Sequence, residues 1–158
     1  MKSFVTLFVC VIFLTSCNNS ERQHANNAAI IENYVHAVEA GNYDSMALFI
    51  ADNYMGYGPS IDDSTNKTDG LKSWKYNLEN VYGKIEYTKS RIIAVTMPDG
   101  PNAGEWVAHW AVATITYKDG RGPVSVYANT NYKIENGKIA RSYTFYNELD
   151  VLEQLGER

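Results

Sequence analysis

The chain has 158 residues, of which 45% are hydrophobic, so it is long enough to form one domain with a hydrophobic core. Its formal net charge is −4, and no block of Lys or Arg occurs anywhere in it. Because phosphate contacts need a basic stripe, this charge pattern argues against binding of nucleic acid.

The first residues have the three-part layout of an export signal. Lys2 is positively charged, Phe4 to Leu14 form an apolar run too short to span a bilayer, and Leu14-Thr15-Ser16-Cys17 follows. This tetrapeptide resembles a bacterial lipobox, and the resemblance implies cleavage of residues 1–16 and lipidation of Cys17. The alternatives are an ordinary secretory signal and an uncleaved anchor. We therefore expect a lipoprotein of the bacterial cell envelope, attached to the membrane only through its lipid and facing the periplasm or the exterior.

Residues 17–27 are polar and aperiodic, which predicts a flexible tether, and residues 28–156 then form a single domain. Neither cysteine is left for a disulfide, because Cys10 leaves with the signal and Cys17 carries the lipid. Apolar residues at helical spacing predict helices over Ala28–Ala40, from Asp44 to Ile50 and from Leu71 to Val81. Asn53 to Tyr57 is a candidate for a brief strand that stops at Gly58-Pro59.

After Gly83 the period of the hydrophobic pattern changes from 3.6 to 2. Four strands are predicted, Lys84–Thr96, Glu105–Tyr117, Val124–Glu135 and Lys138–Tyr146, joined by turns that include Asn136-Gly137. A short helix capped near Asn147 and ended by Gly156 follows. Helices followed by an antiparallel meander indicate an α+β domain with its helices packed on one face of a curved antiparallel sheet.

The two ends of the domain carry a family resemblance. Gly137-Lys138-Ile139, the aromatic strand after it and Leu152-Glu153-Gln154-Leu155-Gly156 resemble the closing segment of SnoaL-like proteins of the nuclear transport factor 2-like superfamily. Tyr34-Val35 to Pro59 resembles the opening helices of the same superfamily. The resemblance implies a cystatin-like α+β roll, in which N-terminal helices cover the concave face of a cone-shaped antiparallel sheet and close a deep pocket.

The ketosteroid isomerases of this superfamily offer a comparison by residue. Their oxyanion-binding tyrosine is matched by Tyr34, their carboxylate base by Gly58 and their protonated acid by Thr130. The two acids that carry that mechanism are therefore missing, which excludes steroid isomerisation by the same route, unless a neighbour such as Tyr57 enters the space at Gly58.

If Thr130 faces the pocket, as its match to the protonated acid implies, the alternation of side chains along each strand predicts which other residues line the pocket. The predicted lining is aromatic and mostly apolar, and it consists of Tyr34, Met55, Tyr57, Trp74, Leu78, His109, Thr130, Tyr132, Thr144 and Tyr146. Such a lining suits a small apolar or aromatic molecule.

His109 is the candidate general acid or base, assisted by Tyr34, and a buried neutral histidine that serves packing is the alternative. Asp62 and Asp63 read as a solvated turn, so we predict no metal, and no motif indicates a cofactor.

The opposite face of the sheet is predicted to be aromatic, and it carries Trp106, Trp110, Tyr127, Tyr143 and Phe145. So large an apolar patch predicts a twofold homodimer. The leading hypothesis is thus a lipid-anchored protein that holds a small ligand without assigned chemistry. The alternatives are an acid-base enzyme of dehydratase, isomerase or cyclase type, and a non-catalytic interaction module that uses the aromatic face.

Overall fold

A computed structural model gives the backbone of residues 2–157 and the side chains of residues 19–157. The elements follow one another as α1 (Lys2–Glu39), α2 (Tyr43–Phe49), β1 (Ile50–Tyr57), β2 (Ser64–Asn66), α3 (Lys67–Asn80), β3 (Tyr82–Met97), β4 (Gly104–Tyr117), β5 (Val124–Glu135), β6 (Lys138–Tyr146) and α4 (Glu148–Leu155). The four long strands and the closing helix lie where the sequence predicts them.

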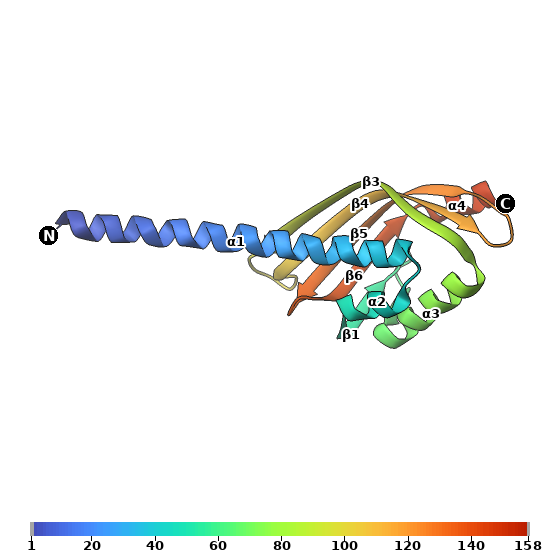
Figure 1. Ribbon diagram of the computed structural model, residues 1–158, viewed down its shortest axis with the longest axis horizontal. Helices are drawn as coiled ribbons and strands as arrows, with labels where there is room; N and C mark the ends of the chain where they lie inside the picture. Colours follow the sequence, from blue (N-terminus) through green and yellow to red (C-terminus); the bar gives the residue numbers. More distant parts are fainter. Residues whose placement is uncertain (1, 158) are drawn as a thin grey trace.

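One curved sheet of six strands, in the order β2-β1-β6-β5-β4-β3, forms the body of the domain (Figure 1). Strands β3 to β6 form the predicted antiparallel meander, and the predicted turn at Asn136-Gly137 has a positive φ at both residues. Strand β1 pairs parallel with β6, so the whole sheet is mixed. The α+β prediction is confirmed.

Helix α1 runs across the concave face of the sheet, with α2 and α3 beside it (Figure 1). The core lies between α1 and the strands, where Ile31, Met46, Val107 and Ile139 are almost fully buried. Burial of such side chains contributes about 1.5–3 kcal/mol each, which is the main source of stability for a domain without disulfides.

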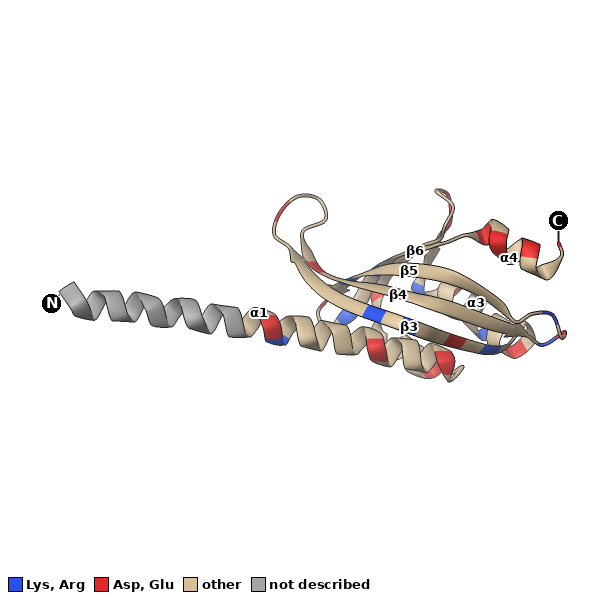
Figure 2. Cartoon of the chain, turned by 90° about the horizontal axis from the view of Figure 1, so that it is seen from above, with Lys and Arg blue, Asp and Glu red and all other residues tan. Residues whose placement is uncertain are grey.

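Residues 19–27 continue α1, in contrast to the flexible tether that their composition predicts. They contain no Gly or Pro that would end the helix, and Asn27 donates to a carboxylate oxygen of Glu105 at 3.1 Å. His24 lies 2.9 Å from the hydroxyl of Thr96. These contacts attach the first described turns to the sheet (Figure 2). The side chains of Cys17 and of the predicted signal, residues 1–16, lie outside the described residues. In the described part of the chain, no helix has the length and apolar content needed to cross a membrane.

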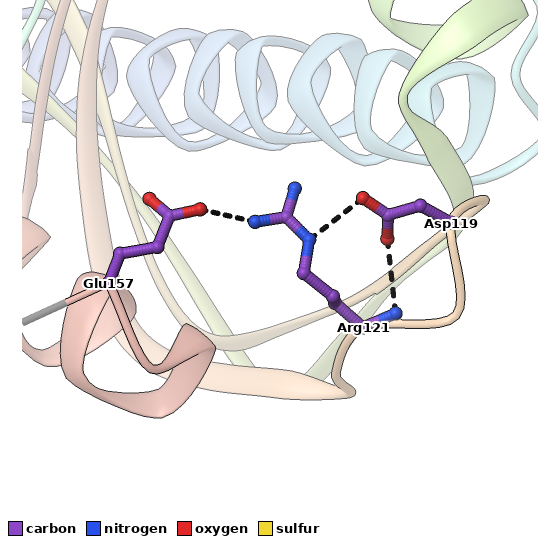
Figure 3. A network of polar contacts seen from close by, with 3 residues as sticks. All are labelled: Asp119, Arg121 and Glu157. Carbon is purple, nitrogen blue, oxygen red and sulfur yellow. Dashed lines mark hydrogen bonds and ion pairs between the residues drawn. The ribbon is translucent and has the colours of Figure 1, made fainter.

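The C-terminal helix is held at the opposite end of the sheet. Gln154 exchanges two hydrogen bonds, each 3.0 Å long, with the backbone of Ser125 on β5. Arg121, in the β4–β5 turn, bonds both Asp119 and Glu157 and so joins that turn to the end of α4 (Figure 3). These contacts hold α4 in place, and Val151 of this helix is one of the residues that line the cavity described below.

Candidate functional site

The inner face of the sheet lines a cavity of about 240 Å³. It is lined by Trp74, Tyr82, Tyr87, His109, Ala111, Ala113, Ile115, Tyr117, Val126, Ala128, Thr130, Tyr132, Thr144, Tyr146 and Val151. The three alanines lie in the middle of β4 and β5, where their small side chains leave the space that the ring of tyrosines surrounds. None of the described residues in the lining is an Asp, Glu, Lys or Arg, so His109 is the residue whose charge has to be considered there.

His109 is the polar centre of this cavity. It is 4% exposed, pairs with Thr130 on β5 and Ile92 on β3, and holds its Nε2 3.1 Å from the hydroxyl of Ser90. Burial lowers the pKa of His109, an effect that the negative charge of Glu39 partly opposes. The imidazole is therefore neutral at pH 7. Among the described residues Nδ1 has no hydrogen-bond partner, so it is available to a ligand.

Two tyrosines in the cavity wall add phenol groups that stay protonated. Burial raises the pKa of Tyr87 to about 12 and raises that of Tyr132 further. The ring of Tyr87 lies 5.6 Å from that of His109. The wall thus offers neutral hydroxyls beside a neutral imidazole, a combination that can exchange hydrogen bonds but cannot neutralise a strongly charged ligand.

Six of the ten predicted pocket residues line this cavity: Trp74, His109, Thr130, Tyr132, Thr144 and Tyr146. Tyr34 lies in the core, with its ring edge-on to Tyr132 at 6.0 Å, and it lines a separate pocket of about 180 Å³ between α3 and β1. The structure therefore does not bring His109 and Tyr34 together in one cavity wall. Leu78 likewise lines a different depression, beside the end of α1.

Met55 and Tyr57 lie on the other side of β1 from the predicted one. They pair with Arg141 and Tyr143, and the ring of Tyr57 stacks on that of Tyr143 at 4.8 Å. Tyr54 points inward instead, and its hydroxyl lies 2.7 Å from that of Ser142. The sequence contains a signal for this orientation. Gly58 matches the carboxylate base of the ketosteroid isomerases, which faces the pocket, and strand alternation then places residues 54 and 56 on the same inner face.

Strand β3 supplies residues that sequence reasoning missed. Tyr82 and Tyr87 line the cavity and Ser90 holds His109. A register shift between Thr88 and Arg91, where Lys89 has a φ of 53°, changes the face of the strand halfway along it. Simple alternation cannot anticipate such a bulge.

The outer face of the sheet is aromatic, but only partly in the predicted way. Trp110, Tyr127 and Phe145 are 44%, 79% and 52% exposed. Trp106 is buried instead, because its indole donates to the carbonyl of Asn102 at 2.8 Å and its ring stacks on Tyr143. Trp106 and Tyr143 are therefore packed within the protein, and three residues of the predicted face remain uncovered.

In the described part of the chain, no three His, Cys, Asp or Glu side chains are grouped so that they could bind one metal ion. Asp62 and Asp63 are both exposed in the loop before β2.

No protein-family model and no curated protein matches this sequence. Solved structures do resemble the fold. An epoxide hydrolase from M. tuberculosis is 12% identical with a TM-score of 0.65, over 85% of this chain and 92% of the other. A candidate polyketide cyclase from Xanthomonas campestris is 13% identical with a TM-score of 0.66, over 84% and 98%. A protein with a ketosteroid isomerase-like fold from Catenulispora acidiphila, in complex with trimethylamine, is 18% identical with a TM-score of 0.62, over 80% and 92%.

Proposed function

We propose that this chain, which has the nuclear transport factor 2-like fold, binds a small, uncharged and largely aromatic molecule in its cavity. The observation that carries the proposal is a cavity of about 240 Å³ lined by aromatic and small apolar side chains, with no Asp, Glu, Lys or Arg among the described residues of the lining. An apolar cavity of about 150 Å³ holds benzene, so this one has room for a molecule of one to two rings. Neutral hydroxyls and the free Nδ1 of His109 would orient it.

The structural neighbours support a small-molecule role without naming the ligand. They are an epoxide hydrolase, a candidate polyketide cyclase and a protein in complex with trimethylamine, so these proteins of similar fold act on or bind small organic molecules. Because the same fold serves many functions, the cavity itself has to identify the ligand class.

A pair of alanine substitutions tests the proposal. Ala113 lies in the cavity wall, and Ala113→Phe should fill the space and abolish binding of 2-naphthalenemethanol, followed by quenching of tryptophan fluorescence or by calorimetry. Ala108 lies on the outer face of the same strand, so Ala108→Phe is the matched control and should leave binding unchanged. Equal binding by both variants, or no binding of small aromatic molecules by the natural protein, would refute the proposal.

A second candidate is acid-base chemistry by His109, of dehydratase, isomerase or cyclase type. It is favoured by the neutral imidazole, whose Nε2 is held by Ser90 while Nδ1 remains available. Tyr34 lies outside the cavity wall, so Tyr87 and Thr130 are the nearer assisting groups. Once a substrate is known, His109→Gln should reduce turnover at least about 100-fold if His109 transfers a proton. Unchanged turnover would leave ligand binding as the sole role.

We also propose that the domain is held at the envelope through lipid on Cys17. The sequence pattern at residues 1–17 supports this proposal. Cys17→Ala should release the protein from the membrane fraction and prevent incorporation of labelled palmitate. Retention of the variant in membranes would indicate an uncleaved anchor.

The exposed aromatic residues Trp110, Tyr127 and Phe145 support a twofold homodimer through the outer face of the sheet. Light scattering at micromolar concentration should give twice the mass of the chain, and Tyr127→Lys should give monomers. A monomeric natural protein would instead favour an interaction module whose aromatic face binds a different protein.

A further inference from the structure

A second depression adjoins the cavity. It is an open cleft of about 390 Å³ between the loop that joins β1 to β2 and the inner face of β6. Thr144 and Tyr146 belong to the walls of both the cleft and the cavity, so the two spaces are adjacent at the end of β6. A molecule whose ring system occupies the cavity could extend a substituent past Tyr146 into the cleft.

The cleft differs from the cavity in having one charged group, the carboxylate of Asp63. No Lys or Arg is among the residues that line it. Three tyrosines, Tyr54, Tyr57 and Tyr146, contribute to the same lining. Among the described residues that line the cleft, the one formal charge is therefore negative, and the same lining includes tyrosines, whose rings also attract cations.

Asp63 owes its position to the absence of a side chain at Gly58. A Cβ atom built on Gly58 would lie 2.9 Å from Cβ and 3.1 Å from Oδ2 of Asp63, so the aspartate packs directly on the glycine backbone. The N–H of Gly58 donates to the carbonyl of Asp63 at 3.1 Å, and the N–H of Asp63 donates to the carbonyl of Ser60 at 3.1 Å. These contacts hold the backbone of Asp63 in the loop, with its exposed side chain in the lining of the cleft.

The electrostatic influence of Asp63 reaches the boundary between the two spaces. Burial raises the pKa of Tyr146, and the negative charges of Glu148 and Asp63 raise it further. The phenol at this boundary therefore stays neutral and offers no charge of its own.

We propose that the cleft binds a protonated amine on the ligand whose apolar body fills the cavity, with Asp63 as the counter-ion. This inference rests on the proposed function and makes it more specific, because it names an aromatic amine as the ligand class. A carboxylate-bearing ligand is disfavoured, since it would face Asp63 with no cation in the lining to compensate.

The test compares two ligands of nearly equal shape, 2-naphthalenemethylamine and 2-naphthalenemethanol, by calorimetry at pH 7. The natural protein should bind the amine about three- to fivefold more tightly, the range expected for an ion pair that remains open to solvent. Asp63→Asn should remove this preference and leave alcohol binding unchanged. Asp62→Asn is the matched control, because Asp62 does not line the cleft, and it should keep the preference. In Gly58→Ala the new methyl group should displace Asp63 and also lower the preference.

The outcomes separate this inference from the proposed function. If Asp63→Asn keeps the full preference for the amine, or if Asp62→Asn loses it equally, the assignment of Asp63 is wrong while binding in the cavity stands. If Ala113→Phe abolishes alcohol binding but leaves amine binding intact, the cleft does not share its ligand with the cavity and the inference fails. If the alcohol does not bind at all, the proposed function itself fails.

Discussion

The hydrogen bond between Tyr54 and Ser142 should contribute measurably to stability, because it joins β1 and β6, the first and last strands along the chain, which are neighbours in the sheet. The two hydroxyl oxygens are 2.7 Å apart, and Ser142 is only 6% exposed. Tyr54→Phe leaves the serine hydroxyl buried without a partner, which should lower the free energy of unfolding by about 2 kcal/mol. Ser142→Ala leaves the tyrosine hydroxyl at the edge of the open cleft, where water can reach it, and should lower the free energy by about 1 kcal/mol.

The double variant decides whether this reasoning is right. With both hydroxyls removed no buried group is left unpaired, so the double variant should lose about 1 kcal/mol, giving a coupling energy of about 2 kcal/mol. Urea unfolding of the four proteins, followed by tryptophan fluorescence, measures each value, and about 1 kcal/mol should shift the melting temperature by about 2–4 °C. If the losses of the single variants simply add in the double variant, the bond carries no coupling and the argument is refuted.

Three further predictions concern the core, the turn and the buried imidazole. Met46→Ala should lower the free energy of unfolding by about 2–5 kcal/mol in a urea titration, because Met46 is fully buried, and a loss below 1 kcal/mol would contradict its place in the core. Gly137→Ala should lower the free energy of unfolding by about 1–2 kcal/mol, because alanine is strained at a φ of 73° and a Cβ there meets nothing within 4 Å that would add a clash. Gly100 lies in another open turn with a positive φ, so Gly100→Ala is the comparison variant. The lowered pKa of His109 means that the unfolded chain binds a proton more readily than the folded one. The contribution of His109 to the free energy of unfolding therefore keeps its full value above about pH 6.5, the ordinary pKa of histidine in the unfolded chain. It declines as the pH falls from there toward the lower pKa of His109 in the folded protein. In His109→Gln the free energy of unfolding should fall less between pH 7.5 and pH 5.5, and an unchanged pH dependence would refute the assignment.

Much of the meander could be predicted because its information is local. Alternation and turn residues specify strands β4 to β6. The inward positions His109, Thr130 and Thr144 follow because these residues lie opposite one another on adjacent strands, with no register shift at that level of the sheet. The cavity that they surround is therefore largely readable from the sequence once the family resemblance supplies the face of one residue.

The parts that could not be predicted depend on contacts between distant segments. The register of β1 is decided by its parallel pairing with β6, about 90 residues away, and the sequence signal for its inner face comes from the family match at Gly58 and not from a local hydrophobic pattern. On β3 the bulge before Arg91 moves Ser90 to a position beside His109. Asp63 is exposed, as its reading as part of a solvated turn predicts, but its packing on Gly58 also places it in the lining of the cleft, which the sequence does not indicate.

The parallel pairing of β1 with β6 also has a kinetic consequence. Residues 50–57 reach their partner only when residues 139–143 are available, so this contact closes a loop that includes most of the domain. Such non-local pairing slows folding relative to helical domains of similar size. A nascent chain that has emerged only as far as β4 lacks β5 and β6. It therefore lacks the strand that pairs in parallel with β1 and the part of the cavity wall that carries Thr144 and Tyr146. The native sheet and its ligand cavity therefore form late, after the last strand has joined.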